Sequence, residues 1–336
     1  MSRPPVGYIE ERPQIFVFLL VPGVSMMTLA AALEPLRSLN RLTRRKAYVW
    51  RLASLDGAPV AASNGIPLPA QSCDEALEGA DYLFACGGLR IQRGNERRYA
   101  ALLRQAARRG ISVGSLSTGT YLLARAGLLA GYRCTIHWEN QSAFQEDFPA
   151  LNCTNKLYEI DRDRLTCSGG IAAMDMMLHV ITERHGRDIA RAVANQFHHE
   201  RIRGERDDQR GGRLEVLAHL PESVRSAIFL MQRHVEEPVA LSYIAQRVHI
   251  GARQLERLFM RHTGVTPLRY YMQLRVERAR ELLIYSDRRI IDIAVSSGFA
   301  STSHFATWYR RIFGTNPSDV RGRDRPPTVP EVISQS

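Results

Sequence analysis

The chain of 336 residues is long enough for two domains, and with 45% hydrophobic and 24% charged residues it has the composition of a folded globular protein. No apolar run reaches the roughly 18–20 residues of a membrane span, and the amino terminus lacks the pattern of a signal peptide, so we expect no membrane association. The net charge of +11 is concentrated in residues 222–325, which hold 17 arginines and 10 acidic residues. Such a basic region attracts nucleic acid, although a solvated basic surface explains the charge equally well.

The amino-terminal part of the chain, residues 14–200, alternates strand-like apolar runs with helical patterns. Strand patterns lie at residues 15–21, 49–55, 81–85, 111–114 and 164–168, and helical patterns at 24–39, 95–109, 121–129 and 171–185. This alternation predicts an α/β fold with a mostly parallel sheet flanked by helices.

One segment of this part carries a chemical pattern. Ser117, Thr118 and Gly119 lie between a predicted strand and a predicted helix, and His137 follows. A small nucleophile at a sharp strand-to-helix turn is the elbow arrangement of hydrolases, and the free N–H groups of the helix start suit an anion. An amidase or hydrolase that uses Ser117 and His137 is therefore one interpretation. Against it, the first glycine of G-x-S-x-G is missing and no carboxylate is placed as the third catalytic residue.

The chain has five cysteines, which is an odd number, and they are widely spaced. This spacing argues against a disulfide framework and against a zinc site, and it favours the reducing cytoplasm. We therefore predict no metal site and no cofactor. A redox sensor at Cys86 has little support, because no resolving cysteine is placed beside it.

Residues 201–213 are polar, charged and contain glycine, which predicts an interdomain linker, and residues 323–336 read as a disordered tail. Between them, residues 214–322 have helical periodicity and match themselves at a shift of 50 residues, with Gly264 opposite Gly314 and Pro267 opposite Pro317. Each copy reads as a short helix, a turn and a longer helix, at residues 241–248, 249–251 and 252–262 and again at 290–297, 298–300 and 301–313. This is the helix-turn-helix plan, which predicts an all-α domain with two such units.

The longer helix of each copy has polar residues opposite its apolar stripe. Short polar groups near a helix start suit base edges, and arginines further along suit phosphates. Two copies in the most basic part of the chain predict sequence-specific binding to double-stranded DNA. The predicted DNA-binding residues are Arg253, Gln254, Arg257, Arg261, Ser301, Ser303, His304, Thr307, Arg310 and Arg311.

Residues 224–321 resemble the AraC/XylS family of transcription regulators. The resemblance is carried by Ile293-Ala294, Gly298-Phe299, Phe313-Gly314, Pro317 and Arg321. It implies that a long helix, here residues 269–285, joins the two units and that their recognition helices enter successive major grooves. RNA polymerase is a further candidate partner.

Residues 14–200 resemble the PfpI-like, class I glutamine amidotransferase-like domain that is fused to AraC-type tails in the GlxA-type subfamily. The resemblance implies a flavodoxin-like or amidotransferase-like fold. The matching segments are Cys86-Gly87-Gly88, Ser117-Thr118-Gly119, His137-Trp138 and Ser168-Gly169-Gly170. In the enzymatic relatives the elbow residue is cysteine, and a serine there does not readily form an anionic nucleophile. The resemblance therefore implies a domain that senses an effector and is not an enzyme.

A degenerate elbow of this kind is predicted to bind a small ligand. The amides of Ser117 and Thr118 would hold a carboxylate, Trp138 would stack on a cationic head group, and Glu34 or Glu139 would pair with it. Simple packing roles for Trp138, Glu34 and His137 remain open. The stretches 34–37 and 137–139 resemble regulators of arginine and of betaine or carnitine breakdown, which implies an amino acid or quaternary amine as effector. The predicted ligand-binding residues are Glu34, Gly88, Ser117, Thr118, His137, Trp138 and Glu139.

The sequence thus predicts a cytoplasmic transcription activator that binds DNA and a small-molecule effector and forms a homodimer through its first domain. The expected domains are residues 1–200, a linker at 201–213, a DNA-binding domain at 214–322 and a tail at 323–336. The alternatives are a hydrolase that uses Ser117 and His137 with a DNA-targeting tail, and an architectural DNA-binding protein.

Overall fold

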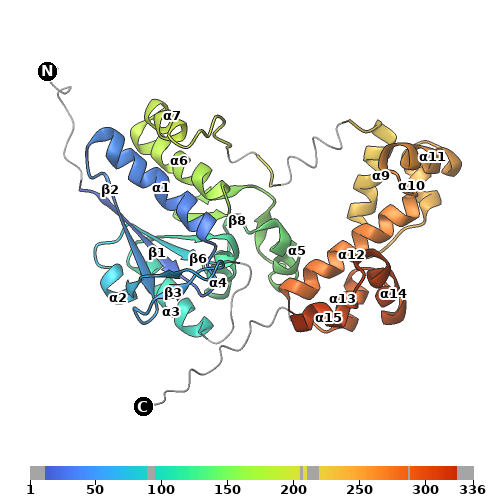
Figure 1. The fold of residues 1–336 in the computed structure, drawn as a ribbon, viewed down its shortest axis with the longest axis horizontal. Helices are drawn as coiled ribbons and strands as arrows, with labels where there is room; N and C mark the ends of the chain where they lie inside the picture. The colour runs from blue at the N-terminus through green and yellow to red at the C-terminus, as the bar shows by residue number, and fades with distance from the viewer. Residues whose placement is uncertain (1–11, 89–94, 205–206, 210–218, 287, 324–336) are drawn as a thin grey trace, which may run out of the picture. The chain divides into compact units, whose positions relative to one another are not determined.

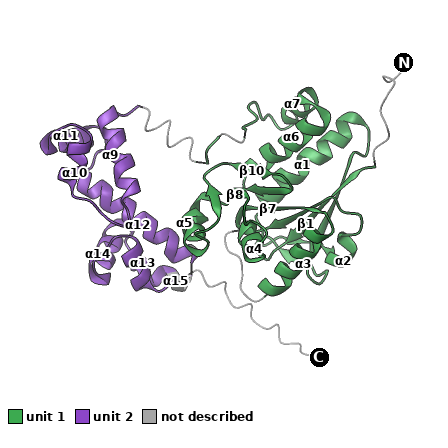
Figure 2. Cartoon of the chain, turned by 180° about the vertical axis from the view of Figure 1, so that it is seen from behind, with its two compact units in different colours: residues 1–210 green, residues 211–336 purple. Residues whose placement is uncertain are grey.

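The computed structural model describes residues 12–88, 95–204, 207–209, 219–286 and 288–323. The chain divides into two compact units, residues 1–210 and 211–336, called here the amino-terminal and carboxy-terminal units (Figures 1 and 2).

A seven-stranded sheet forms the centre of the amino-terminal unit, in the strand order β10-β11-β7-β6-β1-β2-β5. Neighbouring strands run parallel except for the β10–β11 hairpin. The prediction of a mostly parallel sheet is confirmed. The strands are β1 (Gln14–Leu20), β2 (Tyr48–Ser54), β5 (Gln71–Ser72), β6 (Tyr82–Cys86), β7 (Ser112–Leu116), β10 (Tyr158–Asp161) and β11 (Arg164–Cys167).

Helices cover both faces of this sheet (Figure 1). Strand β1 shows why its sequence is apolar throughout: Phe16 and Phe18 belong to the core on one face, whereas Val17 and Leu19 belong to the core on the other. The first core includes residues of α1 (Met26–Thr43), α6 (Ala172–His185) and α7 (Arg187–Asn195). The second includes residues of α2 (Cys73–Ala76), α3 (Glu96–Arg108), α4 (Thr120–Arg125) and α5 (Trp138–Asp147).

Two small sheets complete this unit. Strands β3 (Val60–Ala61) and β4 (Pro67–Leu68) form an antiparallel pair, and β8 (Arg133–Thr135) and β9 (Asn152–Thr154) form a parallel pair. Periodicity did not predict these strands or β10, and it also missed α5 and α7. No helix in the parts of the chain that the structure describes is long and apolar enough to cross a membrane.

The carboxy-terminal unit is helical and contains the predicted repeat. Gly264 and Gly314 each end a helix in the left-handed region, with φ of 72°, and Pro267 and Pro317 each begin the next helix. The helices are α9 (Glu222–Arg233), α10 (Leu241–Arg247), α11 (Ala252–Thr263), α12 (Pro267–Tyr285), α13 (Ile290–Ser296), α14 (Thr302–Phe313) and α15 (Pro317–Arg323).

Helix α12 packs against both copies of the repeat. Its Tyr271 and Leu274 lie in one core with Leu255 and Phe259 of α11. Further along α12, the buried Arg275 donates through Nε to the carbonyl of Ser297 at 3.1 Å, and its guanidinium also bonds to the carbonyl of Gly298. Both contacts fix the end of α13 against α12.

Candidate functional site

Helices α10 and α11, and again α13 and α14, form two helix-turn-helix units with matching turns. His249 and Gly298 occupy the left-handed region, with φ of 57° and 77°. The next residue donates its N–H back into the helix, from Ile250 to the carbonyl of Ala245 at 3.1 Å and from Phe299 to that of Ala294 at 2.9 Å. This is the Schellman ending of a helix, so both copies turn by the same mechanism.

The second helix of each unit presents the predicted polar residues to solvent. On α11, Leu255 and Phe259 are buried, and on α14, Phe305 and Tyr309 are buried at the equivalent positions. All ten predicted DNA-binding residues are exposed: Arg253, Gln254, Arg257, Arg261, Ser301, Ser303, His304, Thr307, Arg310 and Arg311.

Several exposed groups on α14 are held in place by neighbours. Ser301 caps the helix, since its Oγ accepts the N–H of His304 at 3.2 Å. The indole N–H of Trp308 donates to Nε2 of His304 at 3.0 Å, and the guanidinium of Arg311 lies over the Trp308 ring at 5.1 Å. Arg310 bonds to the side chain of Asn316. Trp308 is half-buried and orients His304, a role that its apolar spacing did not predict.

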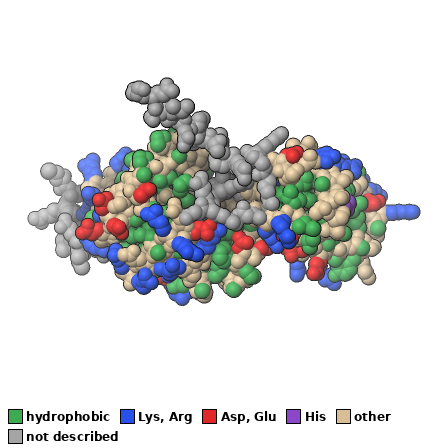
Figure 3. Space-filling view, turned by 90° about the horizontal axis from the view of Figure 1, so that it is seen from below, with side chains coloured by type: hydrophobic (Ala, Val, Ile, Leu, Met, Phe, Trp, Pro, Cys, Tyr) green, Lys and Arg blue, Asp and Glu red, His purple; other side chains and the backbone are tan. Residues whose placement is uncertain are grey.

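Basic side chains occur on both units on the face shown in Figure 3. On this face the presence of basic side chains therefore does not by itself distinguish the two units, although the net charge is concentrated in the carboxy-terminal one. The repeated helix-turn-helix geometry with its exposed polar rows is the specific signal for DNA.

The elbow of the amino-terminal unit lies at the carboxyl edge of the sheet. Strand β7 ends at Leu116, and Ser117 follows as the first residue of a short 3-10 helix, Ser117–Gly119, that leads into α4. Ser117 is buried and has φ of 57°, a left-handed conformation that costs a non-glycine residue about 1–2 kcal/mol. Close packing holds the turn, because a Cβ on Gly119 would lie 1.9 Å from the carbonyl oxygen of Ala85.

In the described chain the elbow does not join the two residues on which the hydrolase interpretation rests. No hydrogen bond joins Ser117 to His137 within the described chain, and Nδ1 of His137 lies 3.6 Å from a carboxylate oxygen of Glu139. Burial lowers the pKa of His137, and Glu139 only partly offsets this effect. Thiol chemistry has no more support, because burial raises the pKa of Cys86 and raises that of Cys167 to about 12.

A cavity of about 370 Å³ lies beside the elbow. Gly169 forms the boundary between them: a Cβ on Gly169 would lie 2.9 Å from Cβ and 3.2 Å from Oγ of Ser117. The cavity is lined by His137, Trp138, Leu157, Ser168, Gly169, Gly170, Ile171, Ala172, His199, Arg203 and Gln209.

The cavity includes some of the predicted ligand-binding residues and not others. His137 and Trp138 line it, and Glu139 follows them on α5. Ser117 and Thr118 belong to the elbow and are not among the lining residues. The Thr118 hydroxyl donates to the carbonyl of Gly88 at 2.7 Å. Glu34 is not among the lining residues and pairs with Arg37 on α1 at 2.7 Å.

Sequence reasoning missed the polar residues on the other side of the cavity. Asp175 of α6 is fully buried, and His199 and Arg203 both bond to it. A single carboxylate inside the apolar stretch 171–181 was a signal that could have indicated a buried polar partner.

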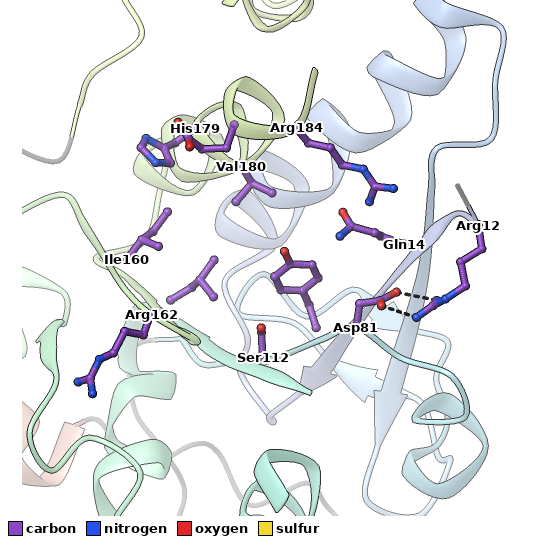
Figure 4. A pocket seen from close by; sticks show the side chains of 12 residues that line it. Arg12, Gln14, Asp81, Ser112, Ile160, Arg162, His179, Val180 and Arg184 are labelled. Atoms are coloured by element: carbon purple, nitrogen blue, oxygen red, sulfur yellow. Dashed lines mark hydrogen bonds and ion pairs between the residues drawn. The ribbon is translucent and has the colours of Figure 1, made fainter. Parts of the chain in front are cut away.

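A larger cavity, of about 730 Å³, lies at the other end of the strands, where their amino ends meet (Figure 4). Gln14, Tyr82 and Ser112 line it from the amino ends of β1, β6 and β7, and at its rim Arg12 pairs with Asp81 at 2.6 Å. No predicted site residue lines it. Because α/β sheets bind ligands at the carboxyl ends of their strands, the cavity beside the elbow is the better candidate.

Two helix-turn-helix units joined by one long helix define a DNA-binding protein. The chain matches the family model described as a helix-turn-helix domain over residues 244–323 and that of the DJ-1/PfpI family over residues 17–183. It is 42% identical to the HTH-type transcriptional regulator GbdR of Pseudomonas aeruginosa, over 93% of this chain and 85% of that protein. It is 40% identical to the HTH-type transcriptional regulator CdhR of the same species, over 92% and 91% of the two chains.

Among solved structures, an AraC family transcriptional regulator from Pseudomonas putida is 31% identical with a TM-score of 0.52, and the match covers 55% of this chain and all of that one. The chain therefore belongs to the AraC family of transcription regulators that carry a DJ-1/PfpI domain at the amino terminus. The predicted family, fold class and DNA-binding regulatory function are confirmed.

Proposed function

We propose that this regulator binds a small zwitterionic metabolite in the cavity beside the elbow, and that binding changes its activity on DNA. The observation that carries the proposal is that Trp138 and Arg203 line the same cavity. An aromatic ring attracts a cationic head group, and a guanidinium binds a carboxylate. A molecule that has both groups would satisfy both residues at once.

The other lining residues fit such a ligand. Trp138 and Ile171 are 36% and 49% exposed, so they offer apolar surface at the cavity. The lowered pKa of His137 favours the neutral imidazole, which does not repel a cation. Glycine betaine, carnitine and arginine combine a cationic group with a carboxylate, and these compounds are the candidates that the sequence resemblance implied.

The rest of the proposal follows from the DNA-binding unit. The exposed residues of α11 would read one stretch of the major groove, through Arg253, Gln254 and Arg257. Those of α14 would read the next stretch, through Ser303, His304 and Thr307. We propose that the protein acts as an activator, as a homodimer in the cytoplasm, and that RNA polymerase is a partner. We propose no catalytic role, because Ser117 and His137 are not joined by a hydrogen bond in the described chain.

Thermal unfolding of the full chain with glycine betaine, L-carnitine and L-arginine tests the proposal. A true ligand at 100 times its Kd stabilises the protein by about 2.7 kcal/mol through mass action. Trp138→Ala should abolish this effect, whereas Trp308→Ala, which removes a tryptophan from α14, should leave it unchanged. The proposal fails if none of the three compounds stabilises the wild-type chain, or if Trp138→Ala responds as the wild type does.

A further inference from the structure

The segment that leads out of the amino-terminal unit is attached to it by many polar bonds. This segment, called here the connector, consists of residues 199–204 and 207–209, and it falls within or just before the predicted linker. The side-chain amide of Gln209 donates to the carbonyls of Ile136 at 2.8 Å and Lys156 at 3.0 Å. The ammonium group of Lys156 pairs with Asp208 at 2.7 Å. The connector therefore belongs structurally to the amino-terminal unit.

Asp175 is the second anchor of the connector. Its Oδ1 lies 2.7 Å from Nε2 of His199 and accepts the backbone N–H of Arg203 at 2.9 Å. Its Oδ2 accepts Nε and Nη2 of Arg203 at 2.9 and 2.6 Å. Because Asp175 is completely buried, removing these partners would leave a buried carboxylate unpaired, so the attachment is costly to break.

The same connector forms one side of the cavity beside the elbow. His199, Arg203 and Gln209 all line it. Arg203 uses Nε and Nη2 for Asp175, and its side chain remains 34% exposed. Among the described residues none bonds to Nη1, which is therefore the group that we assign to a second acceptor. A carboxylate in the cavity would find a guanidinium that is already oriented by a buried partner.

Resting on the proposed function, we propose that Arg203 binds the effector carboxylate and that the effector thereby holds the connector in place. The cavity is complete only when the connector is attached, since three lining residues come from it. A ligand that binds only the attached form shifts the equilibrium toward that form. The chain continues from Gln209 to α9, so the connector is the covalent link between the cavity and the DNA-binding unit.

Hydrogen exchange and calorimetry on the full chain test this proposal, with glycine betaine and L-arginine as probes and choline and agmatine as their counterparts without a carboxylate. At 100 times Kd, glycine betaine or L-arginine should slow amide exchange in residues 199–209 by about tenfold or more. Arg203→Gln should weaken binding of these two probes by about tenfold or more and reduce the affinity for choline and agmatine, which lack the carboxylate, much less.

Two further variants keep the result interpretable. Arg203→Lys retains a cation beside Asp175, so this variant should fold. It loses the forked geometry of the guanidinium, so it should bind the zwitterions less tightly than the wild type does. Arg191→Gln removes an exposed arginine of α7 outside the cavity and should behave as the wild type.

The outcomes separate the two proposals. If zwitterion binding depends on Trp138 but is the same in Arg203→Gln, or if it leaves exchange in the connector unchanged, the role of Arg203 and the connector is refuted and the proposed function stands. If the wild type binds neither these four probes nor L-carnitine, the proposed function is refuted and this inference with it.

Discussion

Replacing Gly298 with alanine should destabilise the second helix-turn-helix unit more than the same change at Gly314. Both glycines adopt the left-handed conformation, with φ of 77° and 72°. Their surroundings differ. A Cβ on Gly298 would lie 2.5 Å from the carbonyl oxygen of Val235 and 2.5 Å from Cγ of Pro238, whereas a Cβ on Gly314 would have nothing within 4 Å.

The magnitude follows from two contributions. The left-handed conformation costs alanine about 1 kcal/mol at either position. At Gly298 the clash with a backbone carbonyl and a proline ring adds roughly 1–3 kcal/mol, the usual cost of overpacking. The free energy of unfolding should therefore fall by about 1 kcal/mol in Gly314→Ala and by about 2–4 kcal/mol in Gly298→Ala.

Differential scanning calorimetry of the two full-length variants measures the difference. For a unit of this size, 2 kcal/mol corresponds to a fall in Tm of roughly 8 °C or more in the transition of the carboxy-terminal unit. Binding of double-stranded DNA at low salt should weaken in parallel at temperatures where that transition has begun. Equal Tm values for the two variants would show that the turn does not pack as the structure has it.

Three other changes test separate parts of the molecule. Arg261→Ala, which removes an arginine further along α11 that is expected to contact phosphate, should weaken binding to any DNA duplex and reduce the slope of log K against log salt by about 1, measured by fluorescence anisotropy; the reasoning is wrong if Arg191→Ala has the same effect. Because the pKa of His137 is lowered in the folded state, the unfolded chain binds the proton more readily, so stability should fall as pH drops below about 6.5. His137→Gln should lose this part of the pH dependence of Tm, and an unchanged profile would contradict it. Ser117→Gly should raise the free energy of unfolding by about 1 kcal/mol, since glycine adopts φ of 57° without a Cβ penalty, and a destabilised variant would count against strain at the elbow.

The sequence predicted the elements whose signals are local and strong. Strands β1, β2, β6, β7 and β11 lie within one or two residues of the apolar runs that indicated them. Strands β8 and β9 have only three residues each, which is too short for a periodic pattern to be recognised, and β10 has no apolar run because Glu159 and Asp161 alternate with its apolar residues. The helical repeat was visible because paired glycines and prolines mark the ends of equivalent helices in both copies.

The same distinction between local and long-range signals applies to the two candidate sites. The exposed faces of α11 and α14 follow from helical periodicity, so every predicted DNA-binding residue is exposed. The cavity depends on contacts between distant segments: Asp175 meets Arg203 across 28 positions of the chain, and a polar, glycine-containing stretch gives no local sign of such a partner. Glu34 was selected from its neighbours in sequence, but its side chain pairs with Arg37 on α1.

The single helix α12 has a consequence for the genetics of the promoters that this protein controls. Its 19 residues span about 28 Å without a break, and each half packs on a different helix-turn-helix unit. The distance between the recognition helices α11 and α14 is therefore fixed by the protein and not by the DNA. We call the two DNA segments that α11 and α14 would contact the half-sites. A promoter should therefore tolerate a base substitution within one half-site better than a base pair inserted between the two half-sites. Inserting about five base pairs, half a turn of the duplex, would place the second half-site on the opposite side of the DNA. Spacing should be the most constrained property of these promoters.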